Sequence, residues 1–219
     1  MSKKHNHESV DTNIESLSKA EAFIAKNNKK IAGGLVAVAV IVIGFLSIRS
    51  CNDAKIAESQ EAFTFTGNSA YMAVDSLSNA EALADLEAYI AEYGNKAVGI
   101  AAFQAGVAAF ELKDYNKAIE YFEQYEGEDE IYNARALACI ADCYIELGNY
   151  EKALQYYSDA VAAADNDFAS EYAFRAGLVA EKLGNNEQAL SFFNVIKNQY
   201  PSSPRAMEVE KYISRIENK

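Results

Sequence analysis

The chain has 219 residues, of which half are hydrophobic and only two are proline, and its formal net charge is −12. This composition allows one or two globular domains and favours a helical fold. The charge is uneven, because residues 1–30 carry six lysines against four acidic residues, whereas the chain from Cys51 onward carries 13 basic and 28 acidic residues. An acidic surface repels phosphate groups, so we expect no nucleic-acid partner.

The first 30 residues form a polar tail. Residues 1–13 lack apolar periodicity, so no regular structure is expected there. Thr12 and Glu15 have the spacing of a helix capping box. An apolar stripe at helical spacing follows: Ile14, Leu17, Ala20, Phe23 and Ile24. This short amphipathic helix either lies on a membrane surface or only leads into the next segment, and the sequence leaves both interpretations open.

The next segment, Ile31 to Ile48, is apolar and has no charge over 18 residues. As a helix it is about 27 Å long, close to the thickness of a membrane's hydrocarbon core. A cleaved signal peptide is disfavoured because 30 residues precede the segment. Lipid attachment at Cys51 is disfavoured because Arg49 and Ser50 do not fit the small residues expected before the modified cysteine. We therefore assign residues 31–50 to a retained transmembrane anchor.

The charges that flank this anchor predict its orientation. Close to the anchor, lysines dominate the N-terminal side and fewer basic residues lie on the other: Lys19, Lys26, Lys29 and Lys30 come before, and Arg49 and Lys55 come after. Positive flanks stay in the cytoplasm, so the tail is predicted to be cytoplasmic and the rest of the chain to lie across the membrane. In a bacterium with two membranes this places a single-pass protein in the inner membrane, with its larger part in the periplasm.

Downstream of the anchor, four kinds of residue recur at a spacing of 35 or 36 positions. The first is always alanine: Ala82, Ala118, Ala153 and Ala189. Four residues after each comes a large side chain: Leu86, Phe122, Tyr157 and Phe193. Twelve residues before each alanine comes a small residue: Ala70, Gly106, Ala141 and Gly177. Four residues before each comes a good helix N-cap: Ser78, Asp114, Asn149 and Asn185. Such a period indicates one structural unit copied several times.

Each unit is interpreted as a helix, a tight turn and a second helix. The small residues allow the two helices to approach closely, the large side chain fills the space beside that contact, and the polar residue caps the second helix. Gly148 and Gly184 directly precede two of these caps, where the first helix is expected to end in a left-handed conformation.

The unit resembles the tetratricopeptide repeat (TPR). The A-x3-F element of that family appears as Ala118/Phe122, Ala153/Tyr157 and Ala189/Phe193, its small eighth position as Gly106, Ala141 and Gly177, and its terminal proline as Pro201. The chain departs from the family pattern in having no tryptophan and in placing Glu130 and Asp165 where proline is usual.

The resemblance implies an all-α fold, with a single N-terminal transmembrane helix followed by a TPR-type α-solenoid. We expect a linker helix and a degenerate TPR hairpin over residues 51–96, three TPR units over residues 97–203, and a C-terminal capping helix over residues 204–219. The last of these has an apolar face suited to covering the final repeat: Ala206, Val209, Tyr212, Ile213 and Ile216.

The repeat region lacks the residues of common catalytic sites. It has no histidine, no H-E-x-x-H motif and no P-loop, so we expect no enzyme, no cofactor and no metal site. Cys139 and Cys143 stand four residues apart on one helix face, where a disulfide is strained. We interpret them as small residues packed between helices, and half of a zinc site is the alternative.

The family register also implies a binding groove on the concave face, lined by the first helix of each unit. These groove positions are Ile100, Phe103, Val107, Phe110, Arg135, Asp142, Ile145, Phe174, Leu178 and Glu181. An apolar groove with an acidic margin suits an extended hydrophobic peptide or a partner helix. The alternative is that Phe103 and Val107 are covered by the degenerate hairpin and belong to the core.

The order of parts resembles the YfgM-like ancillary subunits of the bacterial Sec translocon, which also have a short tail, one span and a periplasmic TPR domain. The run Ala22-Phe23-Ile24-Ala25-Lys26-Asn27 before the span adds to this resemblance. It implies a chaperone or adaptor that receives exported chains beside the translocon and passes them to periplasmic chaperones. A structural scaffold for outer-membrane assembly or cell division is the alternative, and a cysteine- or carboxylate-dependent hydrolase is a third hypothesis.

Overall fold

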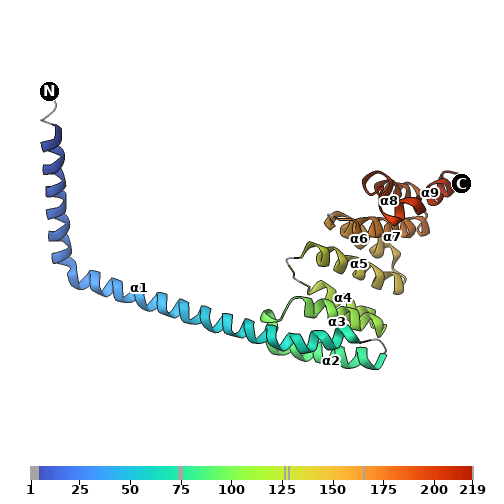
Figure 1. Ribbon diagram of the computed structural model, residues 1–219, viewed down its shortest axis with the longest axis horizontal. Coiled ribbons are helices and arrows are strands. Elements are labelled where there is room, and N and C mark those ends of the chain that lie inside the picture. The colour runs from blue at the N-terminus through green and yellow to red at the C-terminus, as the bar shows by residue number, and fades with distance from the viewer. Residues whose placement is uncertain (1–4, 74–75, 126, 128, 165, 219) are drawn as a thin grey trace. The chain divides into compact units, whose positions relative to one another are not determined.

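The computed structural model describes residues 5–73, 76–125, 127, 129–164 and 166–218, and all regular elements within these ranges are helical. The chain divides into two compact units, Met1–Ala54 and Lys55–Lys219. The elements are labelled along the chain in Figure 1.

The first helix, α1 (His5–Met72), contains the whole first unit from His5 onward. The expectation that residues up to 13 lack regular structure is therefore wrong from His5 on, and Thr12 lies inside the helix rather than at its cap. The physical reason is that helix extension adds one hydrogen bond per residue once a nucleus exists, and no glycine or proline interrupts the chain before Gly33.

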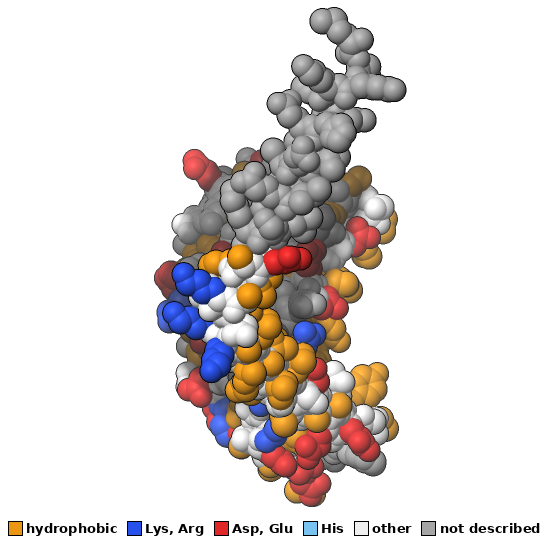
Figure 2. Space-filling model, turned by 90° about the vertical axis from the view of Figure 1, so that its left-hand side faces the viewer, with side chains coloured by type: hydrophobic (Ala, Val, Ile, Leu, Met, Phe, Trp, Pro, Cys, Tyr) orange, Lys and Arg blue, Asp and Glu red, His pale blue; other side chains and the backbone are white. Residues whose placement is uncertain are grey.

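The predicted anchor keeps its apolar side chains at the surface of the first unit. Leu35 is 66% exposed and Ile41 is 70% exposed, and none of the most apolar stretch is buried. Figure 2 shows a broad exposed area of hydrophobic side chains with Lys and Arg side chains along one side of it. Among the described residues, this is the one helix long and apolar enough to cross a membrane by length and composition.

The second unit is a stack of helical hairpins. After the end of α1 it contains, in chain order, α2 (Ser76–Tyr93), the short 3-10 helix η1 (Gly94–Lys96), α3 (Ile100–Glu111), α4 (Tyr115–Glu123), α5 (Glu130–Glu146), α6 (Tyr150–Ala163), α7 (Phe168–Lys182), α8 (Asn186–Gln199) and α9 (Pro204–Glu217). From α2 onward each α-helix packs on the next α-helix, and α9 packs on both α8 and α7. This confirms three hairpins, α3/α4, α5/α6 and α7/α8, followed by a capping helix.

The fourth, degenerate hairpin consists of the end of α1 and α2. Ser59 of α1 is fully buried, and its hydroxyl lies 2.6 Å from the Tyr89 hydroxyl of α2. The Phe63 and Tyr89 rings lie 5.5 Å apart. Helix α2 begins at Ser76, so Ser78 lies inside the helix and not at the predicted cap.

The turns within the three full hairpins have the same hydrogen-bond pattern. In the second hairpin, the Asn149 amide donates to the Tyr144 carbonyl at 2.8 Å and the Gly148 amide donates to the Ile145 carbonyl at 2.9 Å, which is a Schellman motif. Gly148 and Gly184 have φ of 75° and 80°, as predicted. In the first hairpin Lys113 takes the same left-handed position with φ of 63°.

The polar residues that follow these turns cap the second helices unequally. Asp114 and Asn149 accept hydrogen bonds from the backbone amides of Lys117 and Lys152, at 3.3 and 3.1 Å. Asn185 holds the cap position of α8, but its side chain makes no cap bond. The predicted N-caps are thus confirmed by a hydrogen bond in two of the four units.

The predicted alanine and large-residue columns form the interior. Every alanine of the first column is at most 1% exposed, and every large residue of the second is at most 3% exposed. Helix α5 contributes to both core clusters of the second unit, with Ala136, Ile140 and Cys143 in one and Ala138 and Ala141 in the other. Helix α5 therefore joins the two cores, and it also carries part of the candidate site.

Candidate functional site

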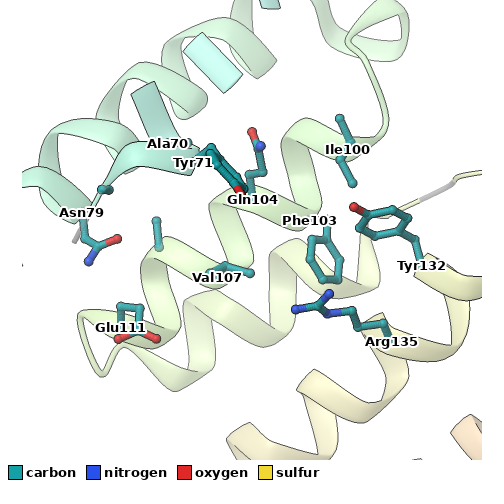
Figure 3. Close-up of a pocket in the computed structure, with 12 residues that line it drawn as sticks. Ala70, Tyr71, Asn79, Ile100, Phe103, Gln104, Val107, Glu111, Tyr132 and Arg135 are labelled. Atoms are coloured by element: carbon teal, nitrogen blue, oxygen red, sulfur yellow. The ribbon is translucent and has the colours of Figure 1, made fainter. Parts of the chain in front are cut away.

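Four of the ten predicted groove residues line one pocket of about 480 Å³ in the second unit, which we call the α3 pocket. Its lining residues are Ala70, Tyr71, Ala73, Asn79, Ile100, Phe103, Gln104, Val107, Ala108, Glu111, Tyr132 and Arg135. Ile100, Phe103, Val107 and Arg135 are the predicted members. The pocket lies beside α3, between the end of α1 and the start of α5 (Figure 3).

Helix α3 supplies both the floor and part of the rim of the α3 pocket. Phe103, Val107 and Glu111 follow one another at four-residue spacing, so they share one face of the helix. Phe103 is buried at 5% exposure, with its ring edge-on to Tyr132 at 5.2 Å and to Phe122 at 5.4 Å. These contacts hold the aromatic floor in one orientation, because each ring is packed on two sides.

The rim of the α3 pocket is apolar and open. Val107 is 38% exposed, and Tyr71 at the end of α1 is 81% exposed. Phe103 is therefore core, as the alternative expected, but the rings packed on it belong to Phe122 and Tyr132 and not to the degenerate hairpin, and Val107 is not covered. An exposed apolar rim over a buried aromatic floor favours contact with another apolar group.

Charged side chains stand at both ends of the α3 pocket (Figure 3). The Arg135 guanidinium lies 5.7 Å from the centre of the Phe103 ring, so it is held by a cation–π contact. Neither Arg135 nor Glu111 forms a salt bridge with any side chain that the structure describes. The pocket therefore has a positive end at α5 and a negative end at the close of α3.

The predicted groove residues on α3 and α5 that lie outside the pocket have partners within the fold. Phe110 packs against Tyr115 with ring centres 5.4 Å apart. Asp142 accepts two hydrogen bonds from Arg175, at 2.8 and 2.9 Å, and a third from the Tyr157 hydroxyl. Ile145 is half-buried and packs against core residues. The structure does not bring these side chains into the α3 pocket.

The groove positions on α7 lie against the C-terminal helix. Phe174 is 4% exposed, with the Tyr212 ring edge-on at 5.1 Å and the Arg205 guanidinium 4.2 Å from its ring centre. Glu181 accepts a hydrogen bond from Arg215, and Leu178 packs against the core. Helix α9 thus occupies the surface that the family register would assign to a ligand.

Sequence reasoning missed several lining residues. Glu111 could have been found by continuing the four-residue spacing from Phe103 and Val107. Tyr71, Asn79 and Gln104 carry no such signal, because their place depends on how the end of α1 packs against α3. The Gln104 side-chain amide donates to the Gly67 carbonyl of α1 at 3.3 Å, which is one of the contacts that closes this side of the pocket.

The chemistry of the second unit suits binding. Burial raises the pKa of the Cys139 thiol to about 11 and that of the Cys143 thiol to about 12, so the reactive thiolate is scarce at neutral pH. Both cysteines are free, as is Cys51. Within the described residues, no group of three or more His, Cys, Asp or Glu side chains is arranged to hold a metal ion.

Solved structures with a similar fold include two repeat proteins. YrrB, described as a TPR protein with an unusual peptide-binding site, is 20% identical, with a TM-score of 0.54 over 76% of this chain and 84% of its own. MamA is 16% identical, with a TM-score of 0.54 over 73% of this chain and 88% of its own. No curated protein matches in sequence. At these identities the likeness shows the fold alone.

Family models give the same result from the sequence. Three models described as tetratricopeptide repeat match residues 70–133, 109–178 and 171–203. Together these matches run without a gap from residue 70 to residue 203, which is more than half of the chain, and they cover the three full hairpins and part of the degenerate one. The chain belongs to the tetratricopeptide repeat family.

Proposed function

We propose that this protein is a membrane-anchored adaptor whose TPR domain binds apolar segments of other proteins in the α3 pocket. The observation that carries the proposal is the pocket itself, in which an exposed apolar rim at Tyr71 and Val107 surrounds a buried aromatic floor. Repeat proteins of this kind act by holding protein partners, and the peptide-binding site named for YrrB supports the same use of the fold.

The anchor in this proposal is the apolar part of α1. An apolar helix whose side chains are exposed on all sides needs lipid or a large apolar partner around it. The excess of lysine before the segment favours a cytoplasmic N-terminus and a TPR domain on the export side of a bacterial inner membrane. A binding domain tethered there is close to chains that leave the membrane before they fold.

The order of parts resembles YfgM-like subunits, so we place the adaptor beside the Sec translocon. Its clients are then newly exported chains, whose apolar segments are exposed until they fold. The α3 pocket has room for a large apolar side chain and not for a folded domain, since its volume is about 480 Å³. This size favours extended or unfolded segments over the scaffold alternative, in which a folded partner docks on a wide surface.

A photo-crosslinking residue at position 107 tests the proposal. Val107 is 38% exposed inside the pocket, and Leu147 at the end of α5 is 42% exposed outside it, so position 147 is a control matched in chemistry and exposure. In cells that export a model secretory protein, we expect position 107 to crosslink the exported chain while it is unfolded, and position 147 to give a much weaker product.

Two other outcomes have clear meanings. A single folded protein captured at position 107 in a one-to-one product, with no exported chain, would support the scaffold alternative. If both positions give the same weak pattern while the protein is present in the membrane at normal levels, the α3 pocket is not a binding site and the proposal fails.

A further inference from the structure

The α3 pocket carries two charges of opposite sign that the fold leaves without salt bridges among the described residues. Arg135 is exposed at the α5 end, and Glu111 is exposed at the end of α3. Other exposed charges of the second unit do form ion pairs, as Lys197 does with Glu210 at 2.8 Å. A ligand in the α3 pocket lies beside both charges, so charges of the opposite sign at matching places on the ligand favour its binding.

The distance between Arg135 and Glu111 determines how far apart two complementary charges on a ligand must be. Phe103, beside which the Arg135 guanidinium lies, is eight residues before Glu111 on the same face of α3. At a rise of about 1.5 Å per residue, eight residues span roughly 12 Å. An extended peptide rises about 3.3 Å per residue, so roughly four residues cover that length.

The rim lies between the two charges. Val107 is midway between Phe103 and Glu111 along α3, and Tyr71 of α1 stands across from it (Figure 3). A large apolar side chain in the middle of the ligand would therefore meet Val107 and Tyr71, with the charged residues on either side of it. This contact removes apolar surface from water on both partners.

We infer that the α3 pocket selects an extended peptide segment that carries one acidic and one basic residue about four positions apart, with a large apolar residue between them. The acidic residue pairs with Arg135, and the basic residue pairs with Glu111. The inference rests on the proposed function, because it names the segment that the adaptor holds. It adds that the charge pattern of a segment, and not its hydrophobicity alone, decides whether it binds.

An unsatisfied polar atom gives further support. The side-chain oxygen of Gln104, a lining residue, is buried and has no hydrogen-bond partner among the groups that the structure describes. A buried acceptor without a donor costs about 1–3 kcal/mol. An extended peptide in the pocket brings backbone amides, which are donors of the kind that this oxygen lacks.

Peptide binding to the full-length protein in lipid nanodiscs tests the inference. The probes are fluorescein-labelled peptides of about ten residues in a Ser/Gly background, with one central Phe, and with Asp and Lys placed four positions apart around it in either order. The controls replace both charged residues with Ser, with two Lys or with two Asp. In fluorescence anisotropy we expect the better Asp/Lys order to bind about fivefold more tightly than the Ser control, and this preference to weaken at high salt.

Charge reversal identifies the groups responsible. Arg135→Glu should remove the preference for the Asp/Lys peptide and make the two-Lys peptide the tightest. Lys152→Glu on α6 changes the net charge by the same amount outside the pocket, and it should leave the preference intact. Arg135 is exposed, so we expect both variants to keep the wild-type helical content in circular dichroism.

The results separate this inference from the proposed function. If all peptides with a central Phe bind equally, whatever their charges, and position 107 still crosslinks exported chains, the charge selection is wrong and the adaptor function stands. If Arg135→Glu and Lys152→Glu weaken binding equally, the effect is one of net charge, and the inference is also overturned. If no peptide binds and position 107 captures nothing, both proposals fail.

Discussion

Two glycines in the repeats lie directly against aromatic rings. A methyl group added at Gly106 would come within 2.7 Å of Phe122, and one added at Gly177 would come within 2.7 Å of the Phe193 Cζ atom. In the middle hairpin, Ala141 and Tyr157 occupy the corresponding places and are both buried. The residue at the small position of each repeat therefore depends on the aromatic ring that packs against it. Glycine is needed where a phenylalanine ring is turned toward the first helix.

We predict that Gly177→Ala destabilises the TPR domain by about 1 kcal/mol. Alanine favours the helix by up to about 1 kcal/mol over glycine, but overpacking a full interior costs about 1–3 kcal/mol. The Phe193 ring is fully buried and packs against Tyr212, so a shift of the ring would disturb its neighbours. Urea unfolding followed by circular dichroism measures the change in the free energy of unfolding.

A double-mutant cycle with Phe193→Leu is the control for this prediction. The smaller side chain makes room for the methyl group, so Gly177→Ala should be neutral or stabilising in that background. If it costs the same with Leu as with Phe at position 193, the contact with the ring is not the cause.

At the left-handed turn position of the first hairpin, we predict that glycine stabilises the TPR domain. Lys113 has φ of 63°, a conformation that costs a residue with a side chain roughly 1–2 kcal/mol and glycine almost nothing. Lys113→Gly should therefore raise the free energy of unfolding by about 0.5–1 kcal/mol, after the greater flexibility of glycine in the unfolded chain is allowed for. Gly148→Ala, at the equivalent position of the next hairpin, should lower it by about 1 kcal/mol. A loss of stability in Lys113→Gly would contradict this account.

At the scale of an element, α9 is held on the last hairpin by charges as well as by apolar contacts. Arg205 donates two hydrogen bonds to Glu171 of α7, at 2.6 and 3.1 Å, and Arg175 donates a third at 2.9 Å. Arg205 also covers the Phe174 ring, and Val209 beside it is fully buried. The α7 side of the predicted groove is closed because the same capping helix also occupies two of its positions, with Arg205 over the Phe174 ring and Arg215 bonded to Glu181.

The charge on Glu171 predicts how the attachment of α9 depends on pH. Burial alone would raise the pKa of Glu171, but hydrogen bonds from Arg205 and Arg175 outweigh it and lower the pKa below its ordinary value of 4.5. The charged Glu171 therefore stabilises the folded protein. This stabilisation is fully present at pH values above the pKa of a glutamate in the unfolded chain, and it is lost as the pH falls through the lower pKa of Glu171 in the folded protein. Glu171→Gln should therefore lower the free energy of unfolding by about 1 kcal/mol at pH 7 and make it fall less steeply as the pH drops below the ordinary pKa of 4.5.

Glu210→Gln on α9 is the matched control, because its carboxylate is 55% exposed and pairs only with Lys197 among the described residues. We expect it to be nearly neutral at pH 7. Hydrogen exchange adds a local test, since the amides of α9 should exchange faster in Glu171→Gln than in Glu210→Gln. Equal exchange in the two variants would show that Glu171 does not hold the helix.

For the whole molecule, the repeat columns predicted most of the fold. The spacing of alanines and large residues gave three hairpins and a capping helix, because such columns report packing between neighbouring helices. The signals that failed were local ones. Ser78 has good capping chemistry but lies inside α2, and Lys113 has no propensity for the turn that it forms. In both cases the packing of the hairpin decides the conformation, and a single residue's preference is too small to oppose it.

The candidate site was less predictable than the fold. The family register named Val107 and Arg135, which both lie on first helices and line the α3 pocket. It could not identify Tyr71 or Gln104, whose positions depend on the end of the long helix α1, or show that α9 covers Phe174. The family register assumes that every repeat has the same neighbours, which is true only in the middle of a repeat array. In this chain the α3 pocket lies at the N-terminal end of the array, and the face covered by α9 lies at the C-terminal end.

The last prediction concerns the side of the membrane on which the TPR domain lies. Close to the apolar segment, four lysines on its N-terminal side against Arg49 and Lys55 on the other predict export of everything from Cys51 onward. An alkaline phosphatase fused after Lys219 folds only where disulfides form, so in a bacterial host it should be active in the full chain and inactive when residues 31–48 are deleted. Replacing Lys26, Lys29 and Lys30 with Glu should lower the activity at equal expression, because it reverses the charge difference across the segment. If the full-chain fusion is intact in the membrane fraction but has no phosphatase activity, the α3 pocket lies in the cytoplasm. The protein is then not an adaptor for exported chains. The peptide selectivity of the pocket is tested separately, by the binding experiment.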